Sequence, residues 1–324
     1  MTRDELADRV IAGDSAALAR AISVIDERRS GHRELVAALH TVNREAPIVG
    51  ITGSPGTGKS TLVDRLIETY RDRDETVGVI GVDPTSPFSG GAILGDRIRM
   101  ESARGDPGVF IRSLSTQGTL GGLSPAVDDV LTAFEAFGMD RIIVETVGAG
   151  QNEIDIVRSA ESVVVVVQPA HGDDIQLLKA GIAEIADLFV VNKADLANVD
   201  RTVRQLRRMV EEADTVGTAT PSWDPPILET IATENTGVEA VVDQLVELRE
   251  QLSHSGRLAD RRRGRYEGQL RRILQAEVND RIQSWLDEDG ISPLIEDILN
   301  RDRDPYGVAA ELIDRASGED ATTS

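Results

Sequence analysis

The residues from Gly53 to Ser60, GSPGTGKS, have the types and spacing of a loop that binds phosphate. Glycines at such positions let successive backbone N–H groups turn toward one anion at the start of a helix. The lysine reaches the β- and γ-phosphates, and the serine after it supplies a hydroxyl to Mg²⁺. The flanking runs IVGIT and STLVDRLIETY predict the strand and the helix that this motif requires. We therefore expect a bound nucleoside triphosphate. The candidate contacts are Gly53, Ser54, Pro55, Gly56, Thr57, Gly58, Lys59, Ser60 and Thr61.

A second motif, NKAD, indicates which base is bound. Asn192, Lys193 and Asp195 follow the apolar run LFVV, at the end of a predicted strand. The aspartate carboxylate can accept two hydrogen bonds, from N1–H and from the exocyclic amine of guanine. Adenine cannot offer that pair, and an unmatched buried carboxylate is costly. The lysine stem packs along the base. The sequence therefore predicts GTP and GDP rather than adenine nucleotides.

Three carboxylates between these motifs are candidate Mg²⁺ ligands. Asp83, Asp96 and Glu145 lie in segments that follow predicted strands, where an acidic side chain can reach a metal beside the phosphates. Helix capping or turn formation is the alternative, since Asp83 precedes a proline and Asp96 follows a glycine. The glycine-rich segment that ends at Gln151 is typical of a loop that swings toward a γ-phosphate.

The composition excludes several classes of function. The chain of 324 residues has no cysteine, four histidines, a formal net charge of −21 and a pI near 4.6. Disulfides and thiolate metal sites are therefore ruled out, and a basic footprint for nucleic acid is not expected. No apolar run has the length of a membrane span, and the N-terminus lacks an apolar export signal, so we expect a cytoplasmic protein.

Lysine is unusually scarce. The chain has 35 lysines and arginines together, but its lysines are only Lys59, Lys179 and Lys193. An acidic, arginine-rich chain resembles the proteins of salt-loving organisms, in which concentrated salt screens surface repulsion. An ordinary acidic cytosolic protein is the alternative. Two of the lysines belong to the motifs above. We therefore expect Lys179, in DDIQLLKAG, to be functional rather than a solvated helix residue.

Apolar runs predict a mainly parallel sheet. Residues 4–42 have helical periodicity, and short valine- and isoleucine-rich runs then alternate with helical segments, as in α/β proteins whose sheet is buried on both faces. The runs are 48–52, 77–82, 109–114, 141–146, 163–168, 188–193 and 226–232. From Val238 the pattern is helical again, and the arginines of RRRGR (261–265) are interpreted as a solvated helix face.

Taken together, these segments resemble the methylmalonyl-CoA mutase-associated GTPases of the MeaB/ArgK type, over roughly residues 10 to 250. The resemblance is carried by GSPGTGKST, VDPTSPFSGGAILGDRIRM, FIRSLSTQGTLGG, VETVGAGQNE, GDDIQLLKAGIAEIADLFVVNKAD and SWDPP. It implies a homodimeric GTPase that chaperones an adenosylcobalamin-dependent acyl-CoA mutase, gates cofactor loading and protects the mutase from inactivation.

The resemblance also implies an architecture. An N-terminal helical extension (1–45) would precede a P-loop GTPase domain (46–250), a C-terminal helical dimerisation arm (251–315) and a disordered tail (316–324). The C-terminal helices could equally pack onto their own domain. Asp83, Asp96 and Glu145 would serve the magnesium region, with Glu145 in place of the more usual aspartate.

In the family two lysines follow the loop that reads GDDIQ here, and the first is implicated in promoting GTP hydrolysis. Lys179 matches that first lysine, and the resemblance implies that the segment from Gln168 to Lys179 is a third switch, which would contact the mutase. A cation brought to the phosphates can neutralise charge on the transferred group. The chain departs from the family pattern at Ala180, where a second lysine is usual, and at Asp174. It departs again at Ile231-Ala232, where a Ser-Ala loop usually contacts the guanine oxygen through backbone N–H groups.

Other functions fit the sequence less well. A nickel metallochaperone GTPase would need a Cys/His relay, which this composition does not offer. A kinase would need an acceptor site, and no motif indicates one. A module that holds GTP only as a structural ligand would not need both the complete phosphate loop and the candidate metal carboxylates.

Overall fold

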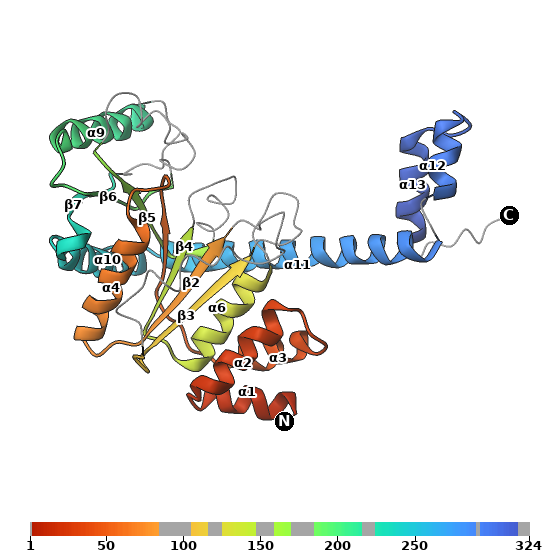
Figure 1. Cartoon of the computed structure of the whole chain (residues 1–324), viewed down its shortest axis with the longest axis horizontal. Coiled ribbons are helices and arrows are strands. Elements are labelled where there is room, and N and C mark those ends of the chain that lie inside the picture. The colour runs from red at the N-terminus through yellow and green to blue at the C-terminus, as the bar shows by residue number, and fades with distance from the viewer. Residues whose placement is uncertain are drawn as a thin grey trace. The chain divides into compact units, whose positions relative to one another are not determined.

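The structure is a computed structural model that describes residues 2–83, 105–115, 125–146, 159–169, 185–215, 224–289 and 292–316. The chain forms two compact units, Met1–Gly268 and Gln269–Ser324, whose elements are labelled in Figure 1. Three of the predicted site residues, Asp96, Gln151 and Lys179, lie outside the described residues.

A parallel sheet of seven strands forms the centre of the first unit, in the order β3-β2-β4-β1-β5-β6-β7. The strands are β1 (Ile48–Thr52), β2 (Val77–Asp83), β3 (Val109–Ser115), β4 (Arg141–Thr146), β5 (Ser162–Val167), β6 (Leu188–Asn192) and β7 (Ile227–Thr230). Each predicted apolar run forms a strand, so the α/β fold class is confirmed. The predicted and observed ends differ by at most two residues, because the runs give no sharp signal where pairing stops.

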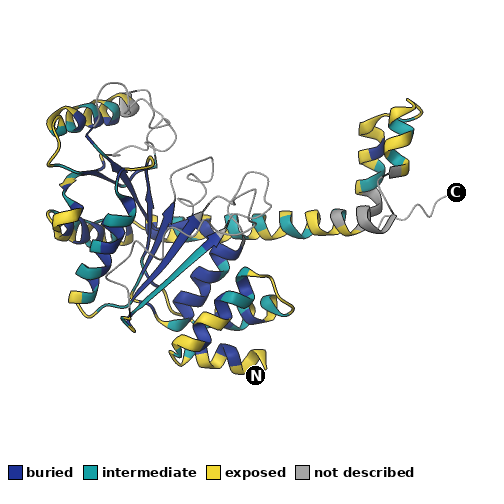
Figure 2. Ribbon diagram, in the orientation of Figure 1, coloured by how far each residue is buried: buried dark blue, intermediate teal, exposed yellow. Residues whose placement is uncertain are grey.

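Helices cover both faces of this sheet. One face packs against α6 (Pro125–Phe137) and, beside it, α9 (Val199–Thr215), while the other packs against α4 (Lys59–Asp72) and α10 (Val238–His254). Alternate residues of one strand serve opposite faces: Ile48 belongs to the α6 side and Val49 to the α4 side. Figure 2 shows the strands as almost continuously buried. This double burial explains why the strand sequences are near-continuous apolar runs.

Three N-terminal helices, α1 (Arg3–Ile11), α2 (Ser15–Asp26) and α3 (His32–His40), pack with α6 in one apolar cluster. The first begins with a capping box formed by Thr2 and Glu5, and the second is capped by Asp14. The Arg44 guanidinium donates to the carbonyl oxygens of Ala136 at 3.0 Å and Phe137 at 3.3 Å, at the C-terminal end of α6. It thereby satisfies carbonyls that a helix end leaves without partners.

The arginines at the start of α11 (Arg257–Asp289) correct one interpretation of the sequence. Arg261 forms a double ion pair with Asp187 at 2.6 and 2.7 Å, Arg262 pairs with Glu161 at 2.7 Å, and Arg265 is buried against Glu135 at 3.1 Å. Only Arg263 is exposed, paired with Glu267. Pairing with acidic residues was expected, but a solvated face was wrong for the other three. A sequence does not show that carboxylates beside β5 and β6 lie within reach of this helix.

The second unit contains the rest of α11, together with α12 (Ser292–Leu299) and α13 (Pro305–Ala316). Its described residues expose large apolar side chains: Leu270, Ile273, Leu274, Val278, Ile295, Leu299, Tyr306 and Ile313.

Candidate nucleotide-binding site

The predicted phosphate loop joins β1 to α4 at the middle of the sheet, between the carboxyl ends of β4 and β5. In open α/β sheets ligands bind at this edge. Two glycines of the loop cannot carry a side chain. Gly53 has φ +142°, and a Cβ there would lie 2.1 Å from the Val166 carbonyl oxygen. Gly58 has φ +90°, and its Cβ would lie 2.4 Å from Asn192 Nδ2. The loop therefore fits tightly against β5 and β6 because these residues are glycine.

Lys59 is buried at the first position of α4 and closes the loop on itself. Its Nζ donates to the carbonyl oxygens of Gly53 at 2.8 Å and Ser54 at 3.1 Å. The Thr57 hydroxyl donates to the same Ser54 carbonyl at 3.0 Å. The ammonium group thus lies inside the ring of backbone groups that would surround a phosphate.

Next to the lysine, Ser60 Oγ donates to Glu145 Oε1 at 2.7 Å. Glu145 is buried on β4, where it pairs in register with Ile51 of β1. A hydroxyl and a carboxylate are the hard oxygen donors that Mg²⁺ prefers, so this pair fits the predicted metal role. Asp83 ends the neighbouring strand β2, whose residue Gly81 pairs with Glu145. The parallel sheet therefore brings Ser60, Glu145 and the end of β2 to one edge.

Asn192, at the end of β6, connects three parts of the site. Its Nδ2 donates to the Thr57 carbonyl at 2.9 Å, while its Oδ1 accepts from Thr230 Oγ1 and from the Ala232 N–H, both at 3.1 Å. Asn192 and its three partner residues are all buried. One amide therefore joins the phosphate loop to the Ile231-Ala232 segment, which the sequence predicted to contact guanine.

Lys193 and Asp195 differ in their surroundings. Lys193 Nζ donates to the Gly56 carbonyl at 2.6 Å and to Gln168 Oε1 at 2.8 Å, and its φ is +60°. The lysine stem thereby lies beside the loop. Asp195 is exposed, so its carboxylate is accessible to the base of a nucleotide.

Thr230 was predicted only as part of the apolar run 226–232, and Gln168 only as part of the run 163–168 and as the start of a switch segment; neither was predicted as a site residue. Each stands at the C-terminal end of a strand, as the recognised motifs do, and that position was the available signal.

A family model for "Methylmalonyl Co-A mutase-associated GTPase MeaB" matches residues 18–287. The chain belongs to this family. Among MeaB relatives, GTPase ArgK of Escherichia coli is 34% identical over 275 residues, 83% of each chain. The methylmalonic aciduria type A homolog of Mus musculus is 30% identical over 328 residues, 97% of this chain and 79% of the mouse protein. A protein of Pyrococcus abyssi is 44% identical over 97% of both chains.

The crystal structure of an LAO/AO transport system kinase has the same fold, with a TM-score of 0.67, 26% identity and 96% of each chain covered. These similarities confirm the P-loop fold and establish the MeaB-family chain as a GTPase. None of the helices in the described ranges has the length and apolar character that crossing a membrane requires.

Proposed function

We propose that this GTPase is the chaperone of an adenosylcobalamin-dependent acyl-CoA mutase of the methylmalonyl-CoA mutase type, gating cofactor loading and protecting the mutase. The observation that carries the proposal is the Asn192 junction of the phosphate loop and the base-binding segments. It occurs in a chain whose match to a mutase-associated family spans residues 18–287. A site that joins both ends of the nucleotide can relate nucleotide state to partner binding.

The nucleotide is GTP or GDP. Asp195 would accept hydrogen bonds from the guanine edge, Lys193 would lie along the base, and the Ile231-Ala232 backbone would meet the guanine oxygen. The residues Gly53 to Thr61 would surround the phosphates, with the Lys59 ammonium against the β- and γ-phosphates.

Ser60, Asp83, Asp96 and Glu145 would hold Mg²⁺. When bound, this ion would neutralise phosphate charge during transfer to water. The buried Glu145 carboxylate orients the Ser60 hydroxyl through the 2.7 Å hydrogen bond. Lys179 would supply a second cation, and Gln151 would orient the attacking water.

A homodimer is part of this proposal. Ten large apolar side chains are exposed in the described residues, and eight belong to the second unit. On α11 they recur at Leu270, Leu274 and Val278, a four-residue spacing that places them along one side of the helix. Exposed apolar surface of this kind marks interfaces. We assign the arm 251–315 to dimerisation, the extension 1–45 to support of the GTPase domain 46–250, and 316–324 to a disordered tail.

We also place the protein in a salt-rich cytoplasm. The excess acidic side chains behind the net charge of −21 repel one another in dilute buffer. Concentrated KCl weakens this repulsion, because the screening length falls to about 3 Å at 1 M salt. Assays of this protein therefore belong in molar KCl.

The test measures GTP turnover in molar KCl with and without a purified mutase from the same cell. The proteins compared are wild type, Lys179→Ala and Lys179→Arg. We expect the mutase to accelerate hydrolysis, Lys179→Ala to lose most of that acceleration, and Lys179→Arg to retain part of it because a cation remains. ATP in place of GTP should turn over poorly.

Two outcomes would contradict the proposal differently. Turnover that the mutase leaves unchanged in wild type would remove the chaperone role while leaving the GTPase intact. Acceleration that is equal in wild type and Lys179→Ala would preserve the partner and remove Lys179 from the mechanism.

A further inference from the structure

Four arginines on α9 form a basic surface on an acidic chain. The opposite side of this helix is buried against β5 and β6 through residues such as Leu206 and Val210. The outward side exposes Arg201, Arg204, Arg207 and Arg208, which we call the α9 arginine face. Because α9 begins four residues after Asp195, this face lies close in sequence to the guanine-binding motif.

No residue of the α9 arginine face has a carboxylate partner within the described ranges, although the chain carries 56 acidic residues. Other arginines of the first unit, such as Arg73, Arg112 and Arg141, each pair with a carboxylate at 2.6 to 3.0 Å.

The arginines of this face repel one another along the helix, although Asp200, Glu211 and Glu212 lie four residues from Arg204, Arg207 and Arg208, respectively. Arg204 is three residues from Arg207 and four from Arg208, spacings at which like charges repel. Arg201 places positive charge in the first turn, where the helix dipole disfavours it. Within the described ranges none of the four guanidinium groups forms an ion pair with those carboxylates, so the arginine face remains available to an external acidic ligand.

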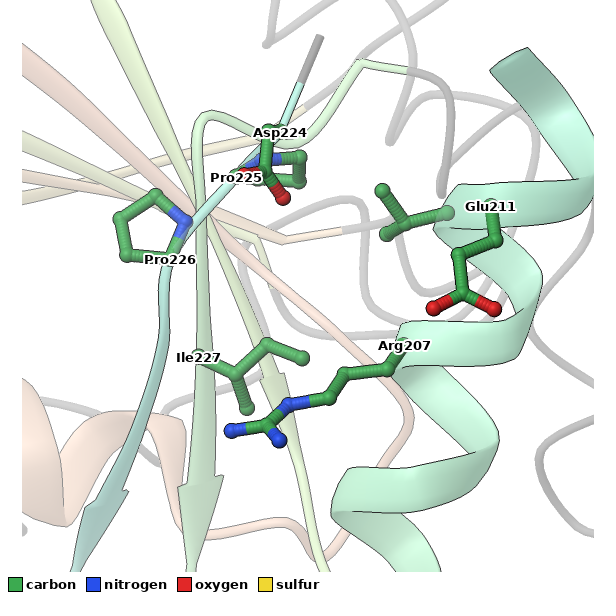
Figure 3. Close-up of a pocket in the computed structure, with 7 residues that line it drawn as sticks. Arg207, Glu211, Asp224, Pro225, Pro226 and Ile227 are labelled. Carbon is green, nitrogen blue, oxygen red and sulfur yellow. The ribbon is translucent and has the colours of Figure 1, made fainter.

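A pocket of about 310 Å³ adjoins the C-terminal end of this face. Figure 3 shows it between α9 and the segment that leads into β7, with the Arg207 guanidinium reaching toward Ile227 and Glu211 one turn further along the helix. Apolar lining comes from Val210, Pro225, Pro226 and Ile227. The two prolines fix the backbone of the facing wall. Arg207, Glu211 and Asp224 supply the polar part of the lining. The pocket therefore offers a preformed, partly apolar recess at the end of a row of arginines.

We propose that the α9 arginine face and this pocket together dock an acidic segment of the mutase. The segment carries carboxylates over about 10 Å, the helical rise over the seven steps from Arg201 to Arg208, followed by an apolar side chain that enters the pocket. This inference rests on the proposed function, which supplies the mutase as partner. Docking there holds the partner on the helix that directly follows the guanine-binding motif.

Other ligands fit the surface less well. A net charge of −21 repels nucleic acid at long range, and a nucleic acid has no apolar side chain for the pocket. A second copy of this chain could offer carboxylates. In that case the arginine face of one copy would bind a different surface of the next copy, each end of the assembly would keep one unused surface, and the assembly would grow.

The first experiment measures binding of the purified mutase by titration calorimetry at several KCl concentrations. It compares wild type with the double variant Arg204→Glu/Arg208→Glu. The matched control is Arg20→Glu/Arg33→Glu, which reverses two exposed arginines on α2 and α3. We expect the α9 variant to bind the mutase about tenfold more weakly or worse, most clearly at low salt. The control should bind like wild type, and both variants should keep wild-type GTP turnover without mutase.

A second experiment uses the absence of cysteine from the chain. Asp200→Cys, at the start of α9, and Ala19→Cys, on α2, each provide a single attachment point for a photo-crosslinker. Asp200→Cys should capture a mutase peptide rich in aspartate and glutamate, and Ala19→Cys should not.

The proposal fails if the α9 variant binds the mutase as tightly as wild type, or if both cysteine positions capture the mutase equally. It also fails if light scattering shows wild type, but not the α9 variant, growing in mass with concentration, since the face would then bind a second copy. If wild type does not bind the mutase at all, the proposed function fails too. If wild type binds the mutase and the α9 variant binds it with the same affinity, only the proposed docking site is removed.

Discussion

Replacing Asn192 by alanine tests whether one buried amide organises the nucleotide site. The substitution removes a donor to the Thr57 carbonyl and an acceptor for Thr230 Oγ1 and the Ala232 N–H. Each of these buried groups would lose a partner at a cost of about 1–3 kcal/mol. Because water can enter part of the space vacated by the amide, we expect the free energy of unfolding to fall by about 2–4 kcal/mol.

The same change should weaken nucleotide binding. Without the amide, the phosphate loop and the Ala232 segment are no longer held together before the ligand arrives. If ordering these two segments on binding costs about 2 kcal/mol, the affinity for GDP falls about 30-fold.

The assay combines urea unfolding of the nucleotide-free protein with calorimetric titration of GDP, both in molar KCl. Thr230→Val removes only one of the donors to Asn192 and should cost about 1 kcal/mol. Asn43→Ala, at an exposed position, should change stability by less than about 0.5 kcal/mol. An Asn192→Ala protein as stable as the Asn43→Ala control would refute the hydrogen-bond argument. A destabilised protein with unchanged GDP affinity would show that Asn192 supports the fold and not the site.

Two further predictions concern packing away from the nucleotide. Arg265→Ala leaves buried Glu135 without its cation and should cost about 3–5 kcal/mol near neutral pH. Burial raises the pKa of Glu135 although Arg265 attracts its charged form. The folded state therefore binds the proton more tightly than the unfolded state, and stability rises as pH falls through the raised pKa toward the ordinary 4.5. Urea titrations over this range should show the Arg265→Ala deficit shrinking, because Glu135 takes up its proton. The Glu135→Ala deficit should grow instead, because that variant lacks the carboxyl through which wild type gains stability as pH falls. Gly78→Ala would place a methyl group 2.7 Å from Phe134 Cδ2 and should cost about 1–3 kcal/mol. Gly264→Ala meets no atom within 4 Å and should stabilise α11 by about 1 kcal/mol, so equal unfolding midpoints for the two variants would contradict this packing.

The sequence by itself determined the elements and the chemistry of the motifs. Strands such as β1 and β4 were predicted at the observed residues because sheet residues buried on both faces must be apolar throughout. The phosphate loop was predicted because backbone N–H groups can converge on an anion only where glycines allow the turn. These are local requirements, and local sequence is enough to express them.

Tertiary structure alone decided which residues meet. The strand order brings Glu145 of β4 to 2.7 Å from Ser60, 85 residues earlier in the chain. The Asn192 hydrogen bond to Thr57 and the burial of Arg265 against Glu135 depend on the same long-range arrangement. An arginine-rich helix has the same local pattern whether its charges meet water or buried carboxylates, so the sequence could not separate α11, which is paired, from α9, whose arginines stay exposed. The difference lies in the contacts that the fold gives each helix, since none of the four exposed α9 arginines forms an ion pair with a described carboxylate.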